Sequence, residues 1–283
     1  MIKICQITFT LFIFIYFCCV SRIVAEGTIL VQSTTSTRNS GLYDVLLPKF
    51  QSITGMQVNV VAVGTGQAIR NAMNCEGDVL IVHSKASEEK FVAEGFGVKR
   101  LDLMYNDFVI LGPRADPARV KLAVTVENAL SRISQGGYKF VSRGDDSGTH
   151  KRETELWIAA GMNPKPFSGH WYIEVGAGMG SALNIAAEIN GYILADRATW
   201  IAFRNKRDLS IVFENDEKLF NQYGVIKVNP KKCPNTNIDG AEMFVNWLTS
   251  KSGQDEIRNY KKSGIQLFYP NSKQSIGYGT FKN

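Results

Sequence analysis

Residues 142–153 combine an arginine, hydroxyl side chains and glycines directly before a predicted helix. Arg143 carries a planar fork of donors that matches an oxyanion, and Ser147 and Thr149 add neutral donors. The free N–H groups at a helix start bear partial positive charge, so a tetrahedral anion can dock there. This stretch is therefore typical of a site that holds a small oxyanion without covalent chemistry.

Two further stretches upstream offer similar donors. Five consecutive hydroxyl residues occupy positions 33–37, after a short apolar run at 28–32 that predicts a strand. We expect residues 33–39 to form a polar loop. Such a run either binds a ligand or forms a turn that caps the next helix. Thr65, between Gly64 and Gly66, can donate from its hydroxyl and its amide. That turn is too short for a nucleotide P-loop, which needs a lysine after the second glycine.

Two aspartates, Asp145 and Asp146, lie inside the arginine stretch, where a carboxylate would repel an anion. Either they hold Arg143 and cap the helix, or one of them accepts a proton from the ligand. A proton acceptor suits hydrogen phosphate but not a fully deprotonated oxyanion. We expect both aspartates to be structural.

The wider pattern places these stretches in an α/β fold. Strands alternate with helices along most of the chain, which indicates a mostly parallel sheet. One pattern occurs four times: a strand, then a turn of small residues, then the start of a helix. The four turns lie at 33–40, 64–67, 142–148 and 176–180. Ligands of open α/β sheets lie outside the carboxyl ends of the strands. The length favours two lobes, which we place at 26–110 with 215–283 and at 111–214.

The N-terminus predicts export. Lys3, an apolar run at 7–20 and small residues at 24–25 have the layout of a signal peptide covering residues 1–25, cleaved before Glu26. The alternative, an anchor helix, needs about 20 apolar residues. Cleavage lowers the net charge from +6 to +4 by removing Lys3 and Arg22. No dense basic run occurs, so nucleic-acid binding is not expected.

Two cysteines, Cys75 and Cys233, remain after cleavage. In an oxidising compartment they either form a disulfide or stay as two buried thiols. The sequence leaves these two alternatives open, because it does not show whether the side chains approach each other.

Taken in order, the four motifs resemble the tungstate-binding component of bacterial tungstate ABC importers. The resemblance implies a type II periplasmic-binding-protein fold, with two α/β lobes, a two-strand hinge and an oxyanion closed between them. The family's Thr-Thr-Thr-Ser motif falls on residues 33–36, with Ser33 replacing the first threonine. Its arginine falls on Arg143, and its Ser-Gly-Thr on residues 147–149. The ligand-binding residues expected from the motifs are Thr34, Thr35, Ser36, Thr65, Gly66, Arg143, Ser147, Gly148, Thr149, Met179 and Gly180.

The resemblance further implies a periplasmic monomer that delivers tungstate or molybdate to an ABC permease in the inner membrane. We expect no cofactor, no metal cation and no catalytic residue. Tungstate and molybdate share charge and shape, so only the resemblance selects tungstate. The alternatives are a phosphate or sulfate receptor and a secreted serine hydrolase using Ser147. A hydrolase needs an oriented His and Asp, and the chain has no Gly-x-Ser-x-Gly elbow.

Overall fold

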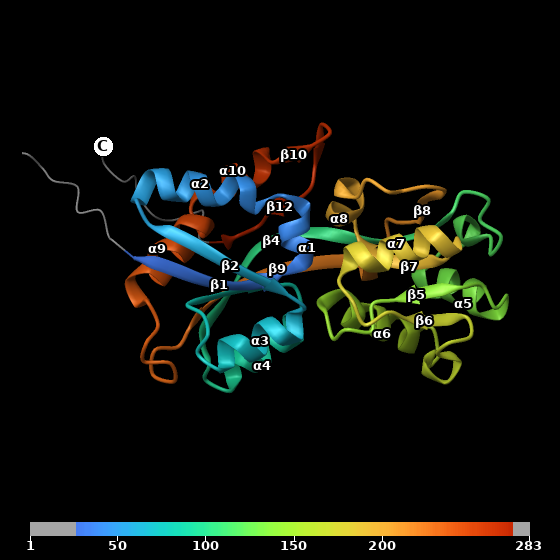
Figure 1. The fold of residues 1–283 in the computed structure, drawn as a ribbon, viewed down its shortest axis with the longest axis horizontal. Helices are drawn as coiled ribbons and strands as arrows, with labels where there is room; N and C mark the ends of the chain where they lie inside the picture. The colour runs from blue at the N-terminus through green and yellow to red at the C-terminus, as the bar shows by residue number, and fades with distance from the viewer. Residues whose placement is uncertain (1–26, 274–283) are drawn as a thin grey trace, which may run out of the picture.

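The computed structural model describes residues 27–273, so the predicted signal peptide at 1–25 lies outside the described residues. Figure 1 shows two groups of elements side by side, joined by two long strands. We call the half built on β1, β2 and β3 lobe 1, and the half built on β5, β6 and β7 lobe 2. Within residues 27–273, no helix has the length and apolar character to cross a membrane.

Lobe 1 is a sheet covered by helices on both faces. Its parallel strands are β1 (Thr28–Thr34), β2 (Gln57–Val63) and β3 (Val79–Val82). All four residues of β3 are buried apolar side chains, as expected for a strand with helices above and below it. One face packs on α2 (Tyr43–Thr54), α9 (Ile238–Thr249) and α10 (Lys251–Asn259). The other face packs on α3 (Thr65–Met73) and α4 (Lys85–Ala93).

A disulfide joins Cys75 and Cys233, whose Cα atoms lie 5.2 Å apart. Cys75 follows α3, and Cys233 lies in the loop before α9. The bond therefore ties the two distant segments of the chain that together make lobe 1.

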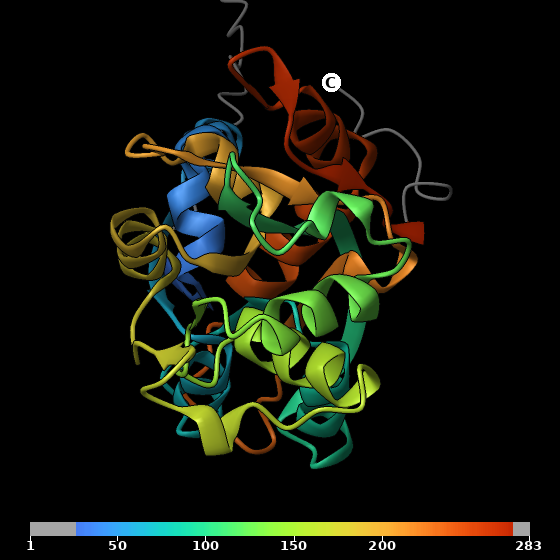
Figure 2. The same ribbon diagram turned by 90° about the vertical axis from the view of Figure 1, so that its right-hand side faces the viewer.

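Lobe 2 repeats the layered arrangement. Its strands are β5 (Phe140–Ser142), β6 (Tyr172–Glu174), β7 (Tyr192–Asp196) and β8 (Leu209–Phe213). On one face α5 (Val126–Gln135) and α6 (Gly148–Ala159) pack around buried Trp157, and α7 (Met179–Ile189) covers the other face. Figure 2 shows this lobe from its outer end. Single helical turns η1 (Val120–Leu122), η2 (Lys165–Phe167) and η3 (Glu217–Leu219) complete the connections.

Two strands connect the lobes, β4 (Gly97–Pro113) and β9 (Phe220–Val228). β4 pairs with β9 as far as Asp107 and with β7 from Phe108 onward, so one strand serves both sheets. These pairings are antiparallel, whereas β1–β3 and β5–β7 pair in parallel, so the sheet is mixed. The exact lobe boundaries at 110/111 and 214/215 stay a prediction.

Arg197 contacts both segments of the chain that cross between the lobes, β4 and the segment that leads into β9. It opens the short helix α8 (Arg197–Ala202). Its Nε and Nη2 donate to the two carboxylate oxygens of Asp107 at 2.7 and 2.6 Å. Nη2 also lies 2.7 Å from Glu214 Oε2. Asp107 belongs to β4 and Glu214 to the returning segment, so one guanidinium contacts both.

The loop predicted at 33–39 is wrong. β1 continues through Thr34, and helix α1 (Thr35–Ser40) starts immediately. Thr34 Oγ1 caps this helix by accepting from the Thr37 amide, and Gly41 ends it at φ +86°, a conformation that glycine adopts readily. Hydroxyl capping thus overrides the weak helix propensity of serine and threonine. The sequence also gave no indication of β10 (Lys261–Lys262), β11 (Ile265–Gln266) and β12 (Tyr269–Pro270).

Candidate anion-binding site

The four small-residue turns meet between the lobes. The Gly148 amide of lobe 2 donates to Thr65 Oγ1 of lobe 1 at 3.0 Å, and the Gly66 amide donates to the Asp146 carbonyl at 3.2 Å. A Cβ placed on Gly178 would lie 3.8 Å from Thr35 Oγ1. Because these contacts cross the cleft, the structure is a closed form in which all four turns face one another.

Arg143 is 2% exposed, although it carries a full charge. Its Nε donates to the Ala177 carbonyl at 3.1 Å, and its Nη2 pairs with Asp145. The other oxygen of Asp145 accepts from the Ser147 amide at 3.2 Å. Asp145 therefore holds both the arginine and the start of α6, which is the structural role expected for it.

Asp146 has a different environment. Its carboxylate accepts from Lys151 Nζ at 2.5 Å and lies 3.4 Å from Arg70 Nη1 of lobe 1. Since all three side chains are substantially exposed, the pair with Arg70 is a weak electrostatic contact across the cleft. Asp146 therefore lies at the rim of the cleft, where it contacts one basic side chain from each lobe.

Three of the expected ligand residues have buried hydroxyls that hydrogen-bond to nothing within the described chain. These oxygens are Thr35 Oγ1, Ser36 Oγ and Thr149 Oγ1. Leaving a buried polar group unpaired costs about 1–3 kcal/mol, so native proteins rarely do so without a reason. An oxyanion accepts hydrogen bonds at every oxygen. A small oxyanion between the lobes would satisfy hydroxyls from both sides.

The other expected hydroxyls already have protein partners. Thr34 caps α1, Thr65 accepts from Gly148, and Ser147 Oγ accepts from the His150 amide at 3.2 Å. A hydroxyl that accepts still has its own hydrogen to donate. Thr65 and Ser147 can therefore fill both roles.

The glycine amides and Met179 behave differently from the expectation. The Gly66 and Gly148 amides are occupied by the contacts between lobes, so they position the cleft. The Met179 side chain is fully buried in the core of lobe 2. The Met179 side chain is therefore not available to a ligand, because it faces the sheet. Binding by Met179 stays a prediction and would use its main-chain amide at the start of α7. Gly180 lies in the same first turn, and a Cβ there would be 4.0 Å from Asn39 Nδ2 of lobe 1.

Two residues that sequence reasoning missed also face the cleft region. His83 follows β3, and a Cβ on Gly148 would lie 2.8 Å from its ring. Asp196 ends β7, is fully buried, and accepts from the Thr199 amide at 2.9 Å. Each comes at the carboxyl end of a buried apolar strand, which is the signal that identified the four turns.

Burial shifts the pKa of both residues in the direction that favours the neutral form. It lowers the pKa of His83 to about 4; the bond to Asn221 opposes this shift and the nearby Arg143 charge adds to it. Burial raises the pKa of Asp196, and the hydrogen bond from the Thr199 amide and the nearby Arg143 charge offset part of the rise. Ser36 Oγ also lies near enough to favour the charged carboxylate, but outside hydrogen-bond geometry. His83 is therefore neutral at pH 7.

The geometry does not support a hydrolase. Ser147 Oγ bonds to the main chain of His150, and His150 Nδ1 accepts from the Asp146 amide at 3.2 Å. These bonds cap a helix and do not make a serine–histidine pair. Across residues 27–273, no group of three His, Cys, Asp or Glu side chains is placed to hold a metal ion.

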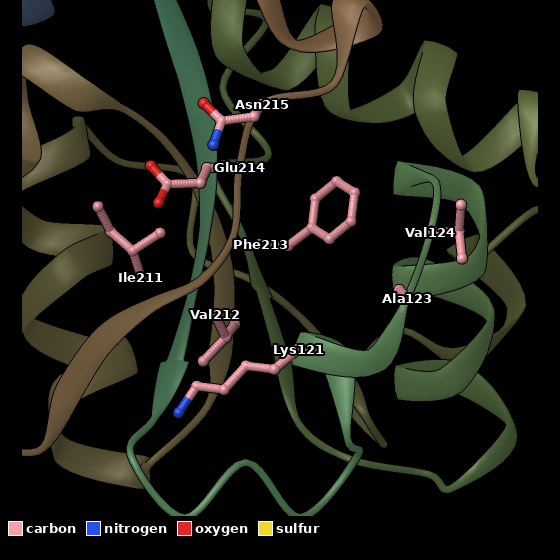
Figure 3. Close-up of a pocket in the computed structure, with 8 residues that line it drawn as sticks. All are labelled: Lys121, Ala123, Val124, Ile211, Val212, Phe213, Glu214 and Asn215. Atoms are coloured by element: carbon pink, nitrogen blue, oxygen red, sulfur yellow. The ribbon is translucent and has the colours of Figure 1, made fainter.

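Two open pockets differ in their relation to the four turns, because one shares no residue with them and the other includes Asp146. The larger, of about 390 Å³, is formed by β8, the segment after it and the region of η1 (Figure 3). None of its lining residues belongs to the expected site. The other, of about 280 Å³, lies between the start of α4 and α6, at the rim marked by Asp146. Neither of these two pockets is lined by Arg143 or by the unpartnered hydroxyl residues Thr35, Ser36 and Thr149.

Comparison with known proteins decides the family. A family model described as a PBP superfamily domain matches residues 24–252. The chain is 48% identical to the tungstate-binding protein TupA of Peptoclostridium acidaminophilum, covering 89% of each chain. The chain belongs to the TupA family of the PBP superfamily. The resemblance and the two-lobe α/β fold expected from its sequence are thereby confirmed.

Solved structures of TupA-family proteins agree. The tungstate-binding protein TupA from Desulfovibrio alaskensis G20 is 46% identical, with a TM-score of 0.74 over 87% of this chain and 99% of that one. The tungstate ABC transporter structure from Geobacter sulfurreducens is also 46% identical, with a TM-score of 0.76 over 83% and 100%.

Proposed function

We propose that this TupA-family chain captures tungstate, or the closely similar molybdate, between its lobes and delivers it to an ABC permease. The observation that carries the proposal is the set of three buried hydroxyls, those of Thr35, Ser36 and Thr149, that come from both lobes and have no hydrogen-bond partner within residues 27–273. The buried cation Arg143 lies in the same loop as the start of α6. The relatives named for tungstate binding support the choice of anion. They are binding proteins of transport systems, which agrees with the prediction that the chain is not an enzyme.

The donor set suits an anion that carries no proton. Each hydrogen bond to a charged group contributes about 1.5–3 kcal/mol, so several together offset the several kcal/mol needed to desolvate a buried ion. Hydroxyls donate without adding charge, and Arg143 adds one positive charge. Binding that favours the closed form then shifts the lobes toward closure.

The cellular setting follows from the same proposal. Residues 1–25 would direct the chain to the periplasm, where an oxidising environment suits the Cys75–Cys233 bond. The mature chain would act as a monomer, with 26–110 and 215–283 as one lobe and 111–214 as the other. Its partner would be the permease of the inner membrane.

One observation favours phosphate as the second candidate. Asp196 Oδ2 is buried without a hydrogen-bond partner in the described chain, so a protonated oxyanion can donate to it. Hydrogen phosphate carries such a proton at neutral pH, whereas tungstate does not. The Asp196 carboxylate would then take the acceptor role that the sequence analysis considered for Asp145.

Competition calorimetry with tungstate, molybdate, phosphate and sulfate at fixed ionic strength tests the proposal. Tungstate or molybdate is expected to bind far more tightly than phosphate or sulfate. Thermal unfolding gives an independent check, because a ligand at 1,000 times its Kd adds about 4 kcal/mol of stability. Tighter binding of phosphate than of tungstate, with the phosphate affinity weakened in Asp196→Asn, would overturn the choice of anion.

A further inference from the structure

His83 of lobe 1 packs against Gly148, the first residue of α6 in lobe 2. Its ring is 6% exposed and stacks on Tyr223, with ring centroids 4.7 Å apart. A Cβ built on Gly148 would lie 2.8 Å from His83 Cε1, 2.9 Å from Nδ1 and 2.9 Å from the His83 carbonyl oxygen. Side chains essentially never approach this closely, so only a glycine fits at position 148 when the lobes are closed.

The need for glycine at this position comes from space and not from backbone conformation. Gly148 is absent from the glycines with positive φ, so its backbone can accommodate an L side chain. It is the first residue of α6, its amide bonds to Thr65 across the cleft, and the next residue is Thr149. The distance between His83 and Gly148 therefore sets where the Thr149 hydroxyl lies.

A chain of buried amides fixes His83 in turn. Its Nδ1 lies 3.0 Å from Asn221 Oδ1, and a carboxamide oxygen only accepts, so Nδ1 carries the hydrogen. Asn221 Nδ2 donates to Asn106 Oδ1 at 2.7 Å. Asn106 and Asn221 face each other directly on β4 and β9, the two strands that connect the lobes. His83 is thus bonded to both hinge strands through one asparagine pair.

We propose that His83 is a positioning residue for anion capture: its ring is the stop that sets how far α6 closes, and the Asn221–Asn106 pair anchors that stop to the hinge. The role is separate from ligand contact, and it explains why a neutral aromatic ring occupies the carboxyl end of β3. Because closure brings Arg143 and Thr149 toward lobe 1, the position of the stop affects affinity without touching the anion. The inference rests on the proposed function in taking the closed form as the anion-bound form.

A size-exchange experiment tests the stop. Gly148→Ala adds a methyl group where the ring lies, so closure is obstructed and tungstate affinity is expected to fall at least tenfold. His83→Ala removes the stop and is expected to weaken binding several-fold. The double variant His83→Ala/Gly148→Ala removes the two ring contacts of the methyl group and leaves its contact with the main-chain carbonyl of residue 83. It is therefore expected to recover part of the loss and to bind tungstate several-fold more tightly than Gly148→Ala alone. Calorimetry measures the affinity, and small-angle scattering with and without tungstate measures closure.

The controls separate the stop from general damage. His170→Ala changes an exposed histidine of lobe 2 and is expected to leave affinity and closure unchanged. Thermal unfolding without ligand is expected to be nearly the same for Gly148→Ala and the parent chain, because the contact joins lobes that separate in the open form. Gly148→Ala with parental affinity, or a double variant no better than Gly148→Ala, would overturn the proposal. If the parent chain closes on phosphate and not on tungstate, the proposed function fails and the same exchange is measured with phosphate.

Discussion

The two lobes contribute different chemistry to one cleft. Lobe 1 offers neutral donors, the hydroxyls of Thr35, Ser36 and Thr65, whereas lobe 2 brings the buried cation Arg143. Lobe 1 is also assembled from both ends of the described chain and tied by a disulfide, while lobe 2 is one continuous insertion. The difference teaches that, among the candidate residues, both lobes supply hydroxyl donors, Thr149 being that of lobe 2, whereas the positive charge comes from lobe 2.

Removing the disulfide is expected to have the largest effect, and on lobe 1 alone. The bond closes a loop with a sequence separation of 158, for which chain entropy gives about 5 kcal/mol. Urea unfolding of the Cys75→Ala/Cys233→Ala variant is expected to show a loss of that order, while tungstate affinity of the folded protein stays within about twofold. Full stability of the parent chain in strong reductant would show that the bond contributes little.

Arg143→Ala tests the charge of lobe 2. Loss of the guanidinium removes charge-assisted hydrogen bonds worth about 1.5–3 kcal/mol each and leaves Asp145 unpaired near the anion. Calorimetry is expected to show at least a hundredfold loss of tungstate affinity. Arg143→Lys keeps the positive charge but loses the planar pair of donors. Its tungstate affinity is expected to lie between those of the parent chain and Arg143→Ala. Parental affinity in Arg143→Ala would make this residue purely structural.

A matched pair of substitutions, Thr35→Val and Thr149→Val, compares one unpartnered hydroxyl from each lobe. Each is expected to weaken tungstate binding about tenfold, because a hydrogen bond to a charged group is lost without a change in shape. Ligand-free stability is expected to hold or rise, since a buried unpaired hydroxyl disappears. Thr34→Val serves as the control, because that hydroxyl caps α1 and its loss costs about 1 kcal/mol of stability. Equal losses of ligand-free stability in all three would mean that the hydroxyls only support the fold.

The last prediction concerns the pH dependence of stability and the interior of lobe 2, and it is expected to leave anion affinity unchanged. Burial raises the pKa of Glu153 from 4.5 to about 8, with its Oε1 2.7 Å from the Tyr172 hydroxyl. Between these pH values the folded chain keeps a proton that the unfolded chain has released. Its contribution to stability therefore falls by about 1 kcal/mol per pH unit as pH rises from 4.5 to 8, and then levels off. Unfolding of Glu153→Gln across pH 5–9 is expected to lack this slope, and an unchanged slope would assign the pH dependence to another group.

Much of the candidate site could be placed from the sequence, because its residues follow strand ends, whereas their contact with an anion stays a prediction. Thr65, Arg143 and Thr149 lie in turns after apolar strands, and parallel strands bring such turns to one edge. Residues 33–39 show where local reasoning failed: serine and threonine favour a loop by propensity, but the Thr34 cap makes a helix. Propensity is a weak guide wherever a side chain supplies the capping bond.

Other parts depended on contacts that no pattern in the sequence records. Met179 follows a glycine turn just as Thr65 does, yet the orientation of α7 buries its side chain in the core. His83 and Asn221 are 138 residues apart, and only the pairing of β3 with β9 brings them together. Long-range register therefore decided which polar residues became part of the site.

The Arg197 contacts have a mechanical consequence. Two strands joining two bodies could twist separately, which would let the cleft open in a skewed way and lose cargo from one side. A guanidinium bonded at two points to Asp107 and at a third to Glu214 resists relative sliding of the two crossings. We therefore expect β4 and the segment that returns through Glu214 to move together when the lobes open or close.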